Sequence, residues 1–498
     1  MNLGEPMNQY KIWYLSSEVS PFAKTGGLGD VTGALPKSLK AKNQEIRVIM
    51  PKYKMINERK YILREVIRLK DIPVTINGDT KTVNVKSAFL PDSKVQIYFV
   101  DIPDLFGRNG LYADNNTGKD YEDNAQRFAF FCRGALETLK ILSWRPDIIH
   151  CNDWQTAFIP IYLKTFYKND EFLHGIKTIF TIHNFSYQGI FNRNLASTLD
   201  IDDNLLEKEG PLELNGNLNL MKGALHYSDW INTVSETYAQ EISTDNKFGY
   251  GLEKVLQGKK KNFSGIVNGV DYNVWSPDID RFIPFRYSSE DLSGKRQNKQ
   301  ALLARVNLKD TENRPVIGMI ARIVEQKGFK LLVECLDELL QEDLQLVILG
   351  KGQIELENKL FEYQKKYPDK ISLNTAFDET LAHMVEAGAD MFLMPSSYEP
   401  CGMNQLYSLR YGTIPIVYKT GGLADTIEEI DLEKNSGNGI IFEKYTSKEL
   451  TKAIKRAIRL YKKQEYWLDI LKRIMAEDHS WDSSTEKYLE VYTTMLNG

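Results

Sequence analysis

Lys24-Thr25-Gly26-Gly27-Leu28-Gly29-Asp30 is the stretch from which the fold can be worked out. It follows a short apolar run, Lys11 to Ser16, that has the composition of a β-strand. After it, apolar residues recur at helical spacing, at Val31, Leu35 and Leu39. The stretch therefore predicts a strand, a glycine-rich turn and the start of a helix.

A second copy of this stretch occurs far downstream. Lys419-Thr420-Gly421-Gly422-Leu423-Ala424-Asp425 repeats six of the seven residues, with Ala424 in the place of Gly29. It also follows an apolar run, Ile414 to Val417. Turn chemistry alone does not require the same lysine and aspartate twice, so we expect both turns to serve one function.

Short apolar runs alternate with helical patterns along most of the chain. In the first half the expected strands are Ile46 to Met50, Val95 to Val100, Ile148 to His150, Lys177 to Thr181 and Trp230 to Val234, and the expected helices are Asn124 to Lys140, Gln155 to Phe166 and Leu218 to His226. In the second half the expected strands are Val316 to Ile320, Gln345 to Leu349, Met391 to Met394 and Ile414 to Val417. Asn77-Gly78 lies between two β-rich runs and predicts a hairpin. The alternation itself indicates parallel sheets.

The alternation stops between Tyr272 and Arg314, a polar and weakly periodic segment in which we place a domain linker. We therefore expect an α/β protein with two Rossmann-like, doubly wound domains facing a deep cleft, at residues 1–275 and 276–465. Residues 466–498 are expected to form helices that could cross back to the first domain. Ligands of such domains bind where strands end and helices begin.

Composition excludes several classes of function. The 498 residues carry 63 Lys and Arg against 67 Asp and Glu, so the net charge of −4 gives no reason to expect nucleic acid or a membrane surface as partner. The four cysteines are far apart and the six histidines have no ligand spacing, so neither disulfides nor a metal site is expected. With no signal or membrane-spanning pattern, we expect a cytoplasmic enzyme.

Cationic candidates follow two of the expected strands. In the first glycine stretch, Lys24 adds a positive charge beside Gly26 and Gly27, whose backbone could approach a phosphate. Arg322 and Lys327 follow the strand Val316 to Ile320 and could neutralise a diphosphate. The alternatives are a turn that needs glycine only for its backbone angles and a pair of solvated side chains.

Polar and aromatic candidates follow three other expected strands. Glu399 could bind sugar hydroxyls or cap a helix, and the neighbouring Cys401 is expected to be a small buried residue because nothing near it in sequence activates a thiol. Asp153 and His183 each end a strand among aromatic residues, as in a carbohydrate pocket. Their alternatives are a helix cap for Asp153 and a core histidine for His183.

Taken together, these motifs resemble the bacterial-type glycogen synthases and starch synthases, a family of GT-B glycosyltransferases. The resemblance runs in order from Lys11 to Leu496 and rests on the first glycine stretch, His183-Asn184, Arg322 with Lys327-Gly328, Glu399-Pro400-Cys401-Gly402 and Lys419-Thr420-Gly421-Gly422-Leu423. One departure is that the loop commonly written His-Asp-Trp reads Asn152-Asp153-Trp154 here. His150 lies two residues too early, so it is not given that histidine's role.

The resemblance implies transfer of glucose from ADP-glucose to the nonreducing end of an α-1,4-glucan, with retention of configuration and without a metal or cofactor. The first domain would be the acceptor side and the second the nucleotide-sugar side. It assigns diphosphate binding to Arg322 and Lys327, and closing over donor and acceptor to Lys24, Gly26 and Gly27. Gly421 and Gly422 would give backbone donors to phosphate, and the other substrate-binding residues would be Asn184, Thr420, Cys401 and Gly402. His183 and Glu399 would bind the transferred glucose, and Asp153 would lie near the acceptor or the reacting centre. UDP-glucose as donor, or a nonenzymatic scaffold that binds glucan or nucleotide sugar, remain the alternatives.

Overall fold

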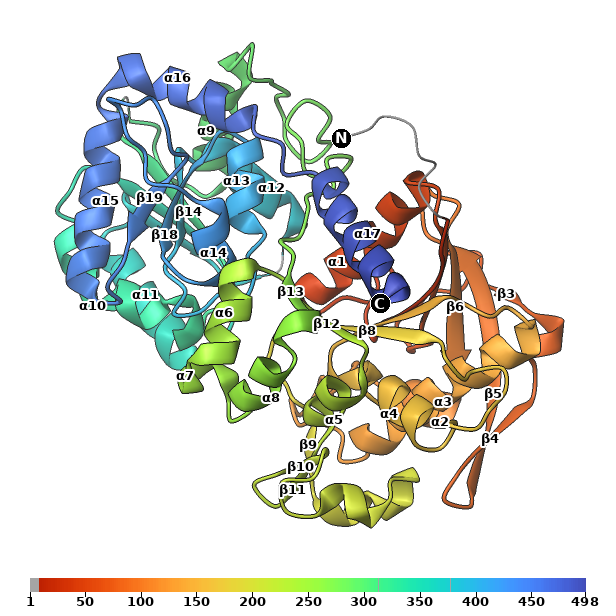
Figure 1. The fold of residues 1–498 in the computed structure, drawn as a ribbon. Helices are drawn as coiled ribbons and strands as arrows, with labels where there is room; N and C mark the ends of the chain where they lie inside the picture. The colour runs from red at the N-terminus through yellow and green to blue at the C-terminus, as the bar shows by residue number, and fades with distance from the viewer. Residues whose placement is uncertain (1–8, 312, 377) are drawn as a thin grey trace. The chain divides into compact units, whose positions relative to one another are not determined.

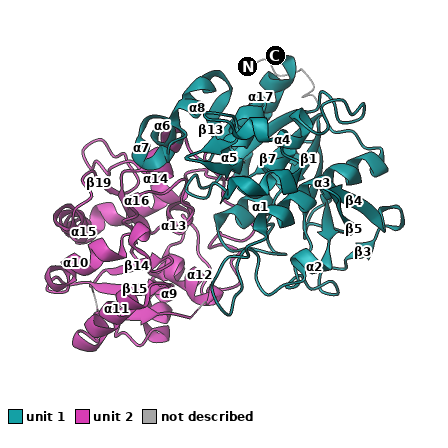
Figure 2. Cartoon of the chain, turned by 90° about the horizontal axis from the view of Figure 1, so that it is seen from below, with its two compact units in different colours: residues 1–234, 239–266, 481–498 teal, residues 235–238, 267–480 magenta. Residues whose placement is uncertain are grey.

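The computed structural model (Figure 1) describes residues 9–311, 313–376 and 378–498. The chain divides into two units (Figure 2). Unit 1 contains the residues up to Val234, Ala239–Ile266 and Trp481–Gly498. Unit 2 contains Ser235–Tyr238 and Val267–Ser480. The chain therefore returns to the first unit with its last eighteen residues, counted from 481 to 498.

Unit 1 is built on a ten-stranded sheet. Its strands are β1 (Lys11–Leu15), β2 (Glu45–Pro51), β3 (Arg64–Glu65), β4 (Ile72–Ile76), β5 (Asp79–Phe89), β6 (Gln96–Asp101), β7 (Ile148–Asn152), β8 (Lys177–Ile182), β12 (Trp230–Thr233) and β13 (Phe263–Gly265). The central strands run parallel in the order β6-β2-β1-β7-β8-β12. This is the order of a doubly wound Rossmann sheet, whose direction of winding reverses between β1 and β7.

The predicted strands of this half are confirmed, and so is the hairpin. β4 and β5 pair antiparallel and are joined at Asn77-Gly78, both of which have positive φ. That backbone suits a tight hairpin turn and is easily adopted by asparagine and glycine. A small separate sheet holds β9 (Ile190–Phe191), β10 (Glu213–Leu214) and β11 (Asn217–Asn219).

The helices of the first half include those that the periodicity predicts, together with others that it does not. They are α1 (Gly27–Ala41), α2 (Pro103–Phe106), α3 (Asn124–Leu142), α4 (Phe158–Lys164), α5 (Leu220–Tyr227), α6 (Glu236–Thr244), α7 (Asn246–Gly249) and α8 (Glu253–Gly258), with 3-10 turns at Ile67–Leu69, Trp154–Thr156, Arg193–Leu195, Ser197–Leu199, Asp203–Leu206 and Lys260–Asn262. Helix α1 begins inside the glycine stretch and buries Val31, Leu35 and Leu39, as its spacing predicts. The helix expected at Gln155 to Phe166 is instead a 3-10 turn followed by the shorter α4.

Unit 2 holds a six-stranded parallel sheet with the same order of winding. Its strands are β14 (Val316–Ile320), β15 (Gln345–Leu349), β16 (Ile371–Asn374), β17 (Met391–Met394), β18 (Ile414–Tyr418) and β19 (Ile440–Phe442). They lie in the order β16-β15-β14-β17-β18-β19, so the winding reverses between β14 and β17. The helices are α9 (Ser293–Arg305), α10 (Phe329–Leu339), α11 (Ile354–Lys366), α12 (Glu379–Gly388), α13 (Asn404–Arg410), α14 (Gly421–Thr426), α15 (Ser447–Tyr461) and α16 (Gln464–Met475), with a 3-10 turn at Glu325–Lys327.

The polar segment in which we place a domain linker contains helix α9, which packs against α12. The segment is therefore not a linker along its whole length. Helix α9 has no apolar stripe, because several of its buried positions are polar and are satisfied by hydrogen bonds. Lys299, for example, donates to Asp390 at 2.6 Å and to the Tyr461 hydroxyl at 3.0 Å. Hydrophobic periodicity cannot find a helix of this kind.

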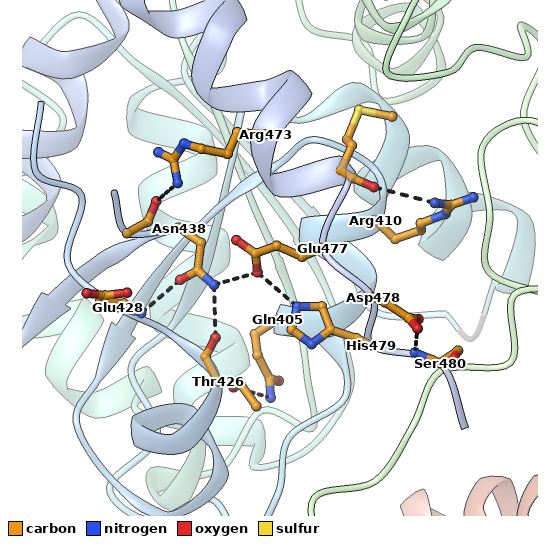
Figure 3. A network of polar contacts seen from close by, with 12 residues as sticks. Gln405, Arg410, Thr426, Glu428, Asn438, Arg473, Glu477, Asp478, His479 and Ser480 are labelled. Carbon is orange, nitrogen blue, oxygen red and sulfur yellow. Dashed lines mark hydrogen bonds and ion pairs between the residues drawn. The ribbon is translucent and has the colours of Figure 1, made fainter. Parts of the chain in front are cut away.

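The chain leaves unit 2 through Glu477 to Ser480, which a polar network ties to the rest of that unit (Figure 3). The Asn438 amide donates to Glu477 at 2.9 Å, and the His479 ring lies 3.0 Å from the same carboxylate oxygen. The Val270 amide donates to the His479 carbonyl at 2.7 Å. Helix α17 (Trp481–Asn497) then packs in unit 1, where the Tyr492 hydroxyl lies 2.8 Å from the His150 ring.

Candidate active site

The first group of predicted residues lies in unit 1, after the two neighbouring strands β1 and β7 between which the direction of winding reverses. The glycine stretch follows β1 and Asp153 follows β7, and these two strands are neighbours in the sheet. Parallel strands present their carboxyl ends at one edge, so the sheet brings these segments together. His183 follows β8, the next strand along.

Asp153 and His183 are joined through the backbone. The Asp153 carboxylate accepts the His183 amide hydrogen at 2.8 Å, and the Asp153 amide donates to the Thr181 carbonyl at 3.0 Å. Burial raises the pKa of Asp153 to about 7, although amide donors from His183 and Asn184 act in the opposite direction. Asp153 also has a positive φ of 56°, a backbone conformation that is unusual away from glycine. A strained, buried carboxylate at a strand end is typical of a functional site.

His183 is held as a neutral ring. Burial lowers its pKa to about 3. Its Nε2 atom lies 2.9 Å from Oδ1 of Asn152, whose own amide group donates to the Leu15 carbonyl. Because that Asn152 oxygen accepts, Nε2 carries the proton and Nδ1 is a hydrogen-bond acceptor. His150 is also a core histidine, since it is fully buried between Tyr492 and Thr181.

The first glycine stretch is exposed at its centre. A Cβ atom added at Gly26 or Gly27 would meet nothing within 4 Å, so packing within the protein does not require glycine at either position. Lys24 forms an ion pair with Asp30 at 2.7 Å across the same turn. Asn184 is not directed like its neighbour His183, since its side-chain oxygen accepts from the Ser186 amide and hydroxyl in a local turn.

In unit 2 the second group of residues lies at the equivalent reversal, after β14 and β17. Lys327 Nζ lies 2.6 Å from Glu399 Oε2, which also accepts from the Ser396 hydroxyl at 2.9 Å. Sequence reasoning missed Ser396, because a lone serine at a strand end carries no distinguishing pattern. Arg322 is exposed and has no ion pair with any carboxylate in the described part of the chain.

The second glycine stretch packs closely on the Glu399 loop. A Cβ atom at Gly421 would clash with the Glu399 carbonyl, and one at Gly422 would clash with the Cys401 carbonyl. The Gly422 amide donates to the carbonyls of Glu399 and Pro400 at 3.1 and 3.2 Å. The Gly422 amide thus donates within the protein in this structure, and its role as a donor to phosphate stays a prediction. These glycines are needed for close backbone approach.

The remaining predicted residues support this packing. Thr420 is buried and precedes α14. Gly402 has a φ of 72°, and a Cβ atom there would clash with the Gln405 side chain. Burial raises the pKa of the Cys401 thiol to about 12, so it is protonated and unsuited to be a nucleophile. The two copies of the stretch also differ, since Lys419 pairs with Glu443 and Asp425 accepts from Thr237.

Comparison with known proteins identifies the family to which the chain belongs. A family model described as the starch synthase catalytic domain matches residues 11–258, and one described as glycosyl transferases group 1 matches residues 303–470. Glycogen synthase 2 of Geobacter metallireducens is 43% identical over 484 residues, which cover 97% of this chain and 98% of the relative. The chain belongs to the glycogen and starch synthase family.

Other members of the family agree over the full length. The glycogen synthase of Alkaliphilus metalliredigens is 42% identical, covering 97% of this chain and all of the relative, and that of Thermotoga maritima is 41% identical, covering 98% and 99%. The solved catalytic domain of starch synthase IV from Arabidopsis thaliana, bound to ADP and acarbose, is 33% identical with a TM-score of 0.89, covering 99% of this chain and all of that one. The resemblance seen in the sequence is confirmed. This member of the glycogen and starch synthase family has the GT-B fold and is a glucosyltransferase of glucan synthesis.

Proposed function

We propose that this enzyme transfers glucose from ADP-glucose to the nonreducing end of an α-1,4-glucan with retention of configuration. The observation that carries the proposal is the meeting of Lys327, Glu399 and Ser396 at the winding reversal of the unit 2 sheet, with Arg322 at the end of β14. Ligands of doubly wound sheets bind at such reversals. A glucan-binding scaffold would not need this set of cations beside a sugar-binding carboxylate.

Arg322 and Lys327 are proposed to bind the diphosphate of the donor. As the glycosidic C–O bond breaks, negative charge grows on the leaving diphosphate, and fixed cations stabilise that state more than the ground state. The guanidinium of Arg322 can hold two oxygens at once, whereas Lys327 acts as a compact charge. Lys327 already neutralises Glu399 at 2.6 Å, so donor binding places the ammonium between a carboxylate and a phosphate.

Glu399 is proposed to bind the transferred glucose rather than to attack it. Its Oε2 atom accepts two hydrogen bonds, from Lys327 and Ser396, and both reduce its nucleophilicity. We therefore favour attack by the acceptor hydroxyl on the same face from which the diphosphate leaves. Trapping a covalent glucosyl-enzyme on Glu399 would contradict this.

The unit 1 residues are proposed to serve the sugar and the acceptor. The neutral His183 can accept a hydrogen bond from a glucose hydroxyl through Nδ1. Asp153 is proposed to lie near the acceptor hydroxyl, where a carboxylate with a pKa of about 7 could receive its proton. Lys24 is proposed to add positive charge to the leaving group once its pairing with Asp30 is broken.

The purified protein should be assayed with ADP-glucose and UDP-glucose, each with glycogen as acceptor. We expect glucose to be incorporated from ADP-glucose and to be released by an enzyme that cleaves only α-1,4 bonds. A higher kcat/KM with UDP-glucose would overturn the assignment of the donor. Absence of turnover with both donors would overturn the proposed reaction.

A further inference from the structure

The carboxylate of Glu18 holds the start of the first glycine stretch. Glu18 follows strand β1 and is 3% exposed. Its Oε2 atom accepts the Thr25 amide hydrogen at 2.5 Å, and its Oε1 atom accepts the Thr25 hydroxyl at 2.6 Å. One residue of the stretch is therefore bound twice by one buried side chain.

The same carboxylate also reaches a third segment. Oε1 accepts the Tyr112 hydroxyl at 2.8 Å, and that hydroxyl lies 2.7 Å from the Ser17 hydroxyl. The Glu18 backbone carbonyl accepts the Thr32 hydroxyl at 2.6 Å, from inside helix α1. Glu18 thus joins the end of β1, the glycine stretch, helix α1 and the segment that contains Tyr112.

These bonds fix the backbone immediately beside Lys24. The Lys24 side chain is 48% exposed and flexible, so the position of its ammonium depends on where its backbone is held. Thr25 is the next residue, and Gly26 and Gly27 beyond it add no stiffness of their own. Hydrogen bonds to a carboxylate are stronger than those between neutral groups, so the two that Thr25 makes can hold this short turn in one conformation.

We propose that Glu18 is a positioning residue that holds Thr25, and through it Lys24, in the geometry required for catalysis. This inference rests on the proposed role of Lys24 in stabilising the leaving group. Misplacing a catalytic group by about 1 Å can lower a rate by about 100-fold. The Glu18 carboxylate accepts three hydrogen bonds from the protein, and the proposed role needs no contact with substrate.

The inference is tested by a double-mutant cycle of Glu18→Ala with Lys24→Ala, measuring kcat and both KM values. In the otherwise unchanged enzyme we expect Glu18→Ala to lower kcat by at least about tenfold, with smaller changes in KM for donor and glucan. In the Lys24→Ala background we expect Glu18→Ala to lower kcat by less than about twofold, because the group that it positions is already gone.

Glu18→Gln is the conservative variant. Its amide oxygen can still accept the Thr25 amide hydrogen, while its NH₂ group can donate to the two hydroxyls, so kcat should recover to within about threefold of the unchanged enzyme. Tyr61→Phe is the matched control. It deletes a hydrogen bond to the Pro21 carbonyl, on the segment leading into the same turn but away from Thr25, and should leave kcat unchanged.

Equal losses from Glu18→Ala with and without Lys24 would overturn the inference, as would a Glu18→Ala enzyme that is fully active. If Lys24→Ala alone keeps the full rate, the proposed role of Lys24 fails, and this inference fails with it. If Glu18→Ala does not fold, Thr25→Val replaces it in the cycle. That change replaces one hydroxyl with a methyl group on an exposed residue, and it should lower kcat by about threefold only when Lys24 is present.

Discussion

At the scale of single residues, the Lys327–Glu399 pair gives the clearest test of the proposed role of Lys327 in catalysis. Lys327→Ala removes the cation proposed for the diphosphate and leaves the buried Glu399 carboxylate with the Ser396 hydroxyl as a donor but without its cation. We expect kcat to fall by about 100-fold or more, measured with ADP-glucose and glycogen. Lys330→Ala is the control, because Lys330 is exposed and pairs loosely with Glu325 at 3.5 Å. Equal effects of the two changes would contradict the role given to Lys327.

The raised pKa of Asp153 predicts that kcat depends on pH. Since burial raises its pKa to about 7, the carboxylate forms only as the pH rises through 7, and kcat should rise over the same interval if Asp153 acts as a base. Asp153→Asn should abolish that rise and most of the activity. A profile for the unchanged enzyme that is flat between about pH 6 and 8 would contradict the assignment.

The raised pKa of Asp153 also makes the free energy of unfolding depend on pH. A raised pKa means that the folded state binds the proton more tightly than the unfolded state. The stabilisation is full below the ordinary pKa of 3.8 and is lost as the pH rises through about 7. Asp153→Asn mimics the protonated group, so above pH 7 it should raise the urea midpoint while lowering activity. A lower midpoint at pH 8 would show that the ionised carboxylate is stabilising.

At the scale of elements, Gly328 shows why one particular turn requires glycine. It lies between the 3-10 turn that carries Lys327 and helix α10, its φ is 82°, and a Cβ atom there would clash with the Pro395 carbonyl. Gly328→Ala should therefore lower the free energy of unfolding by more than about 1–2 kcal/mol, measured by urea denaturation. Gly258→Ala is the comparison, because nothing lies within 4 Å of a Cβ atom at Gly258. A Gly328→Ala protein as stable as the unchanged one would contradict this account.

Helix α9 makes a second prediction at this scale. Lys299 and Asp390 are buried and paired at 2.6 Å, and Asp390 also accepts the Val316 amide hydrogen at the start of β14. Lys299→Met leaves that carboxylate without its cation, which should destabilise unit 2 by about 3–5 kcal/mol. Lys366→Met removes an exposed lysine that pairs with Asp337 and should not change the urea midpoint. Equal midpoints for both variants would show that the buried pair is dispensable.

What the sequence predicts depends on how each element is stabilised. Strands such as Val316–Ile320 and helices such as α1 bury a regular apolar pattern, and that pattern can be read directly. Helix α9 buries lysine and asparagine through hydrogen bonds to distant residues, so only the folded chain reveals it. β16 alternates apolar residues with Ser372 and Asn374 over only four positions, and β19 has only three residues, so neither forms an apolar run that the sequence makes recognisable.

The residues of the candidate site also divide into those that the sequence predicts and those that it does not. Residues at strand ends, such as Asp153 and Glu399, were found because the topology of a doubly wound sheet tells where to look. The partners that hold them were not found. Ser396 lies only three positions before Glu399 but carries no distinguishing pattern, and Glu18 contacts Thr25 and Tyr112 over seven and ninety-four positions of sequence. Sequence patterns identify the residues that contact a substrate more readily than the residues that hold those side chains in position.

At the scale of the whole molecule, the last helix completes the first unit. In unit 1, the Tyr488 hydroxyl accepts from the Asn232 amide on β12 at 3.1 Å, and the Tyr492 hydroxyl lies 2.8 Å from the His150 ring on β7. Deleting Trp481–Gly498 removes both of these hydrogen bonds and opens the two side chains to water. Each lost hydrogen bond costs about 0.5–1.5 kcal/mol, beyond the loss of apolar packing from α17.

Hydrogen exchange of the truncated chain tests this division. We expect faster exchange in β7, β8 and β12 of unit 1, whereas β14, β15 and β17 of unit 2 keep their protection, because no strand of unit 2 is in the unit that α17 completes. Tyr492→Phe is a milder variant that removes one hydroxyl beside His150 and should raise exchange mainly in β7 and β8. Faster exchange in both units alike would mean that the two sheets unfold together. Unchanged exchange in β7 would mean that the sheet is stable without its last helix, and that the return of the chain serves another purpose.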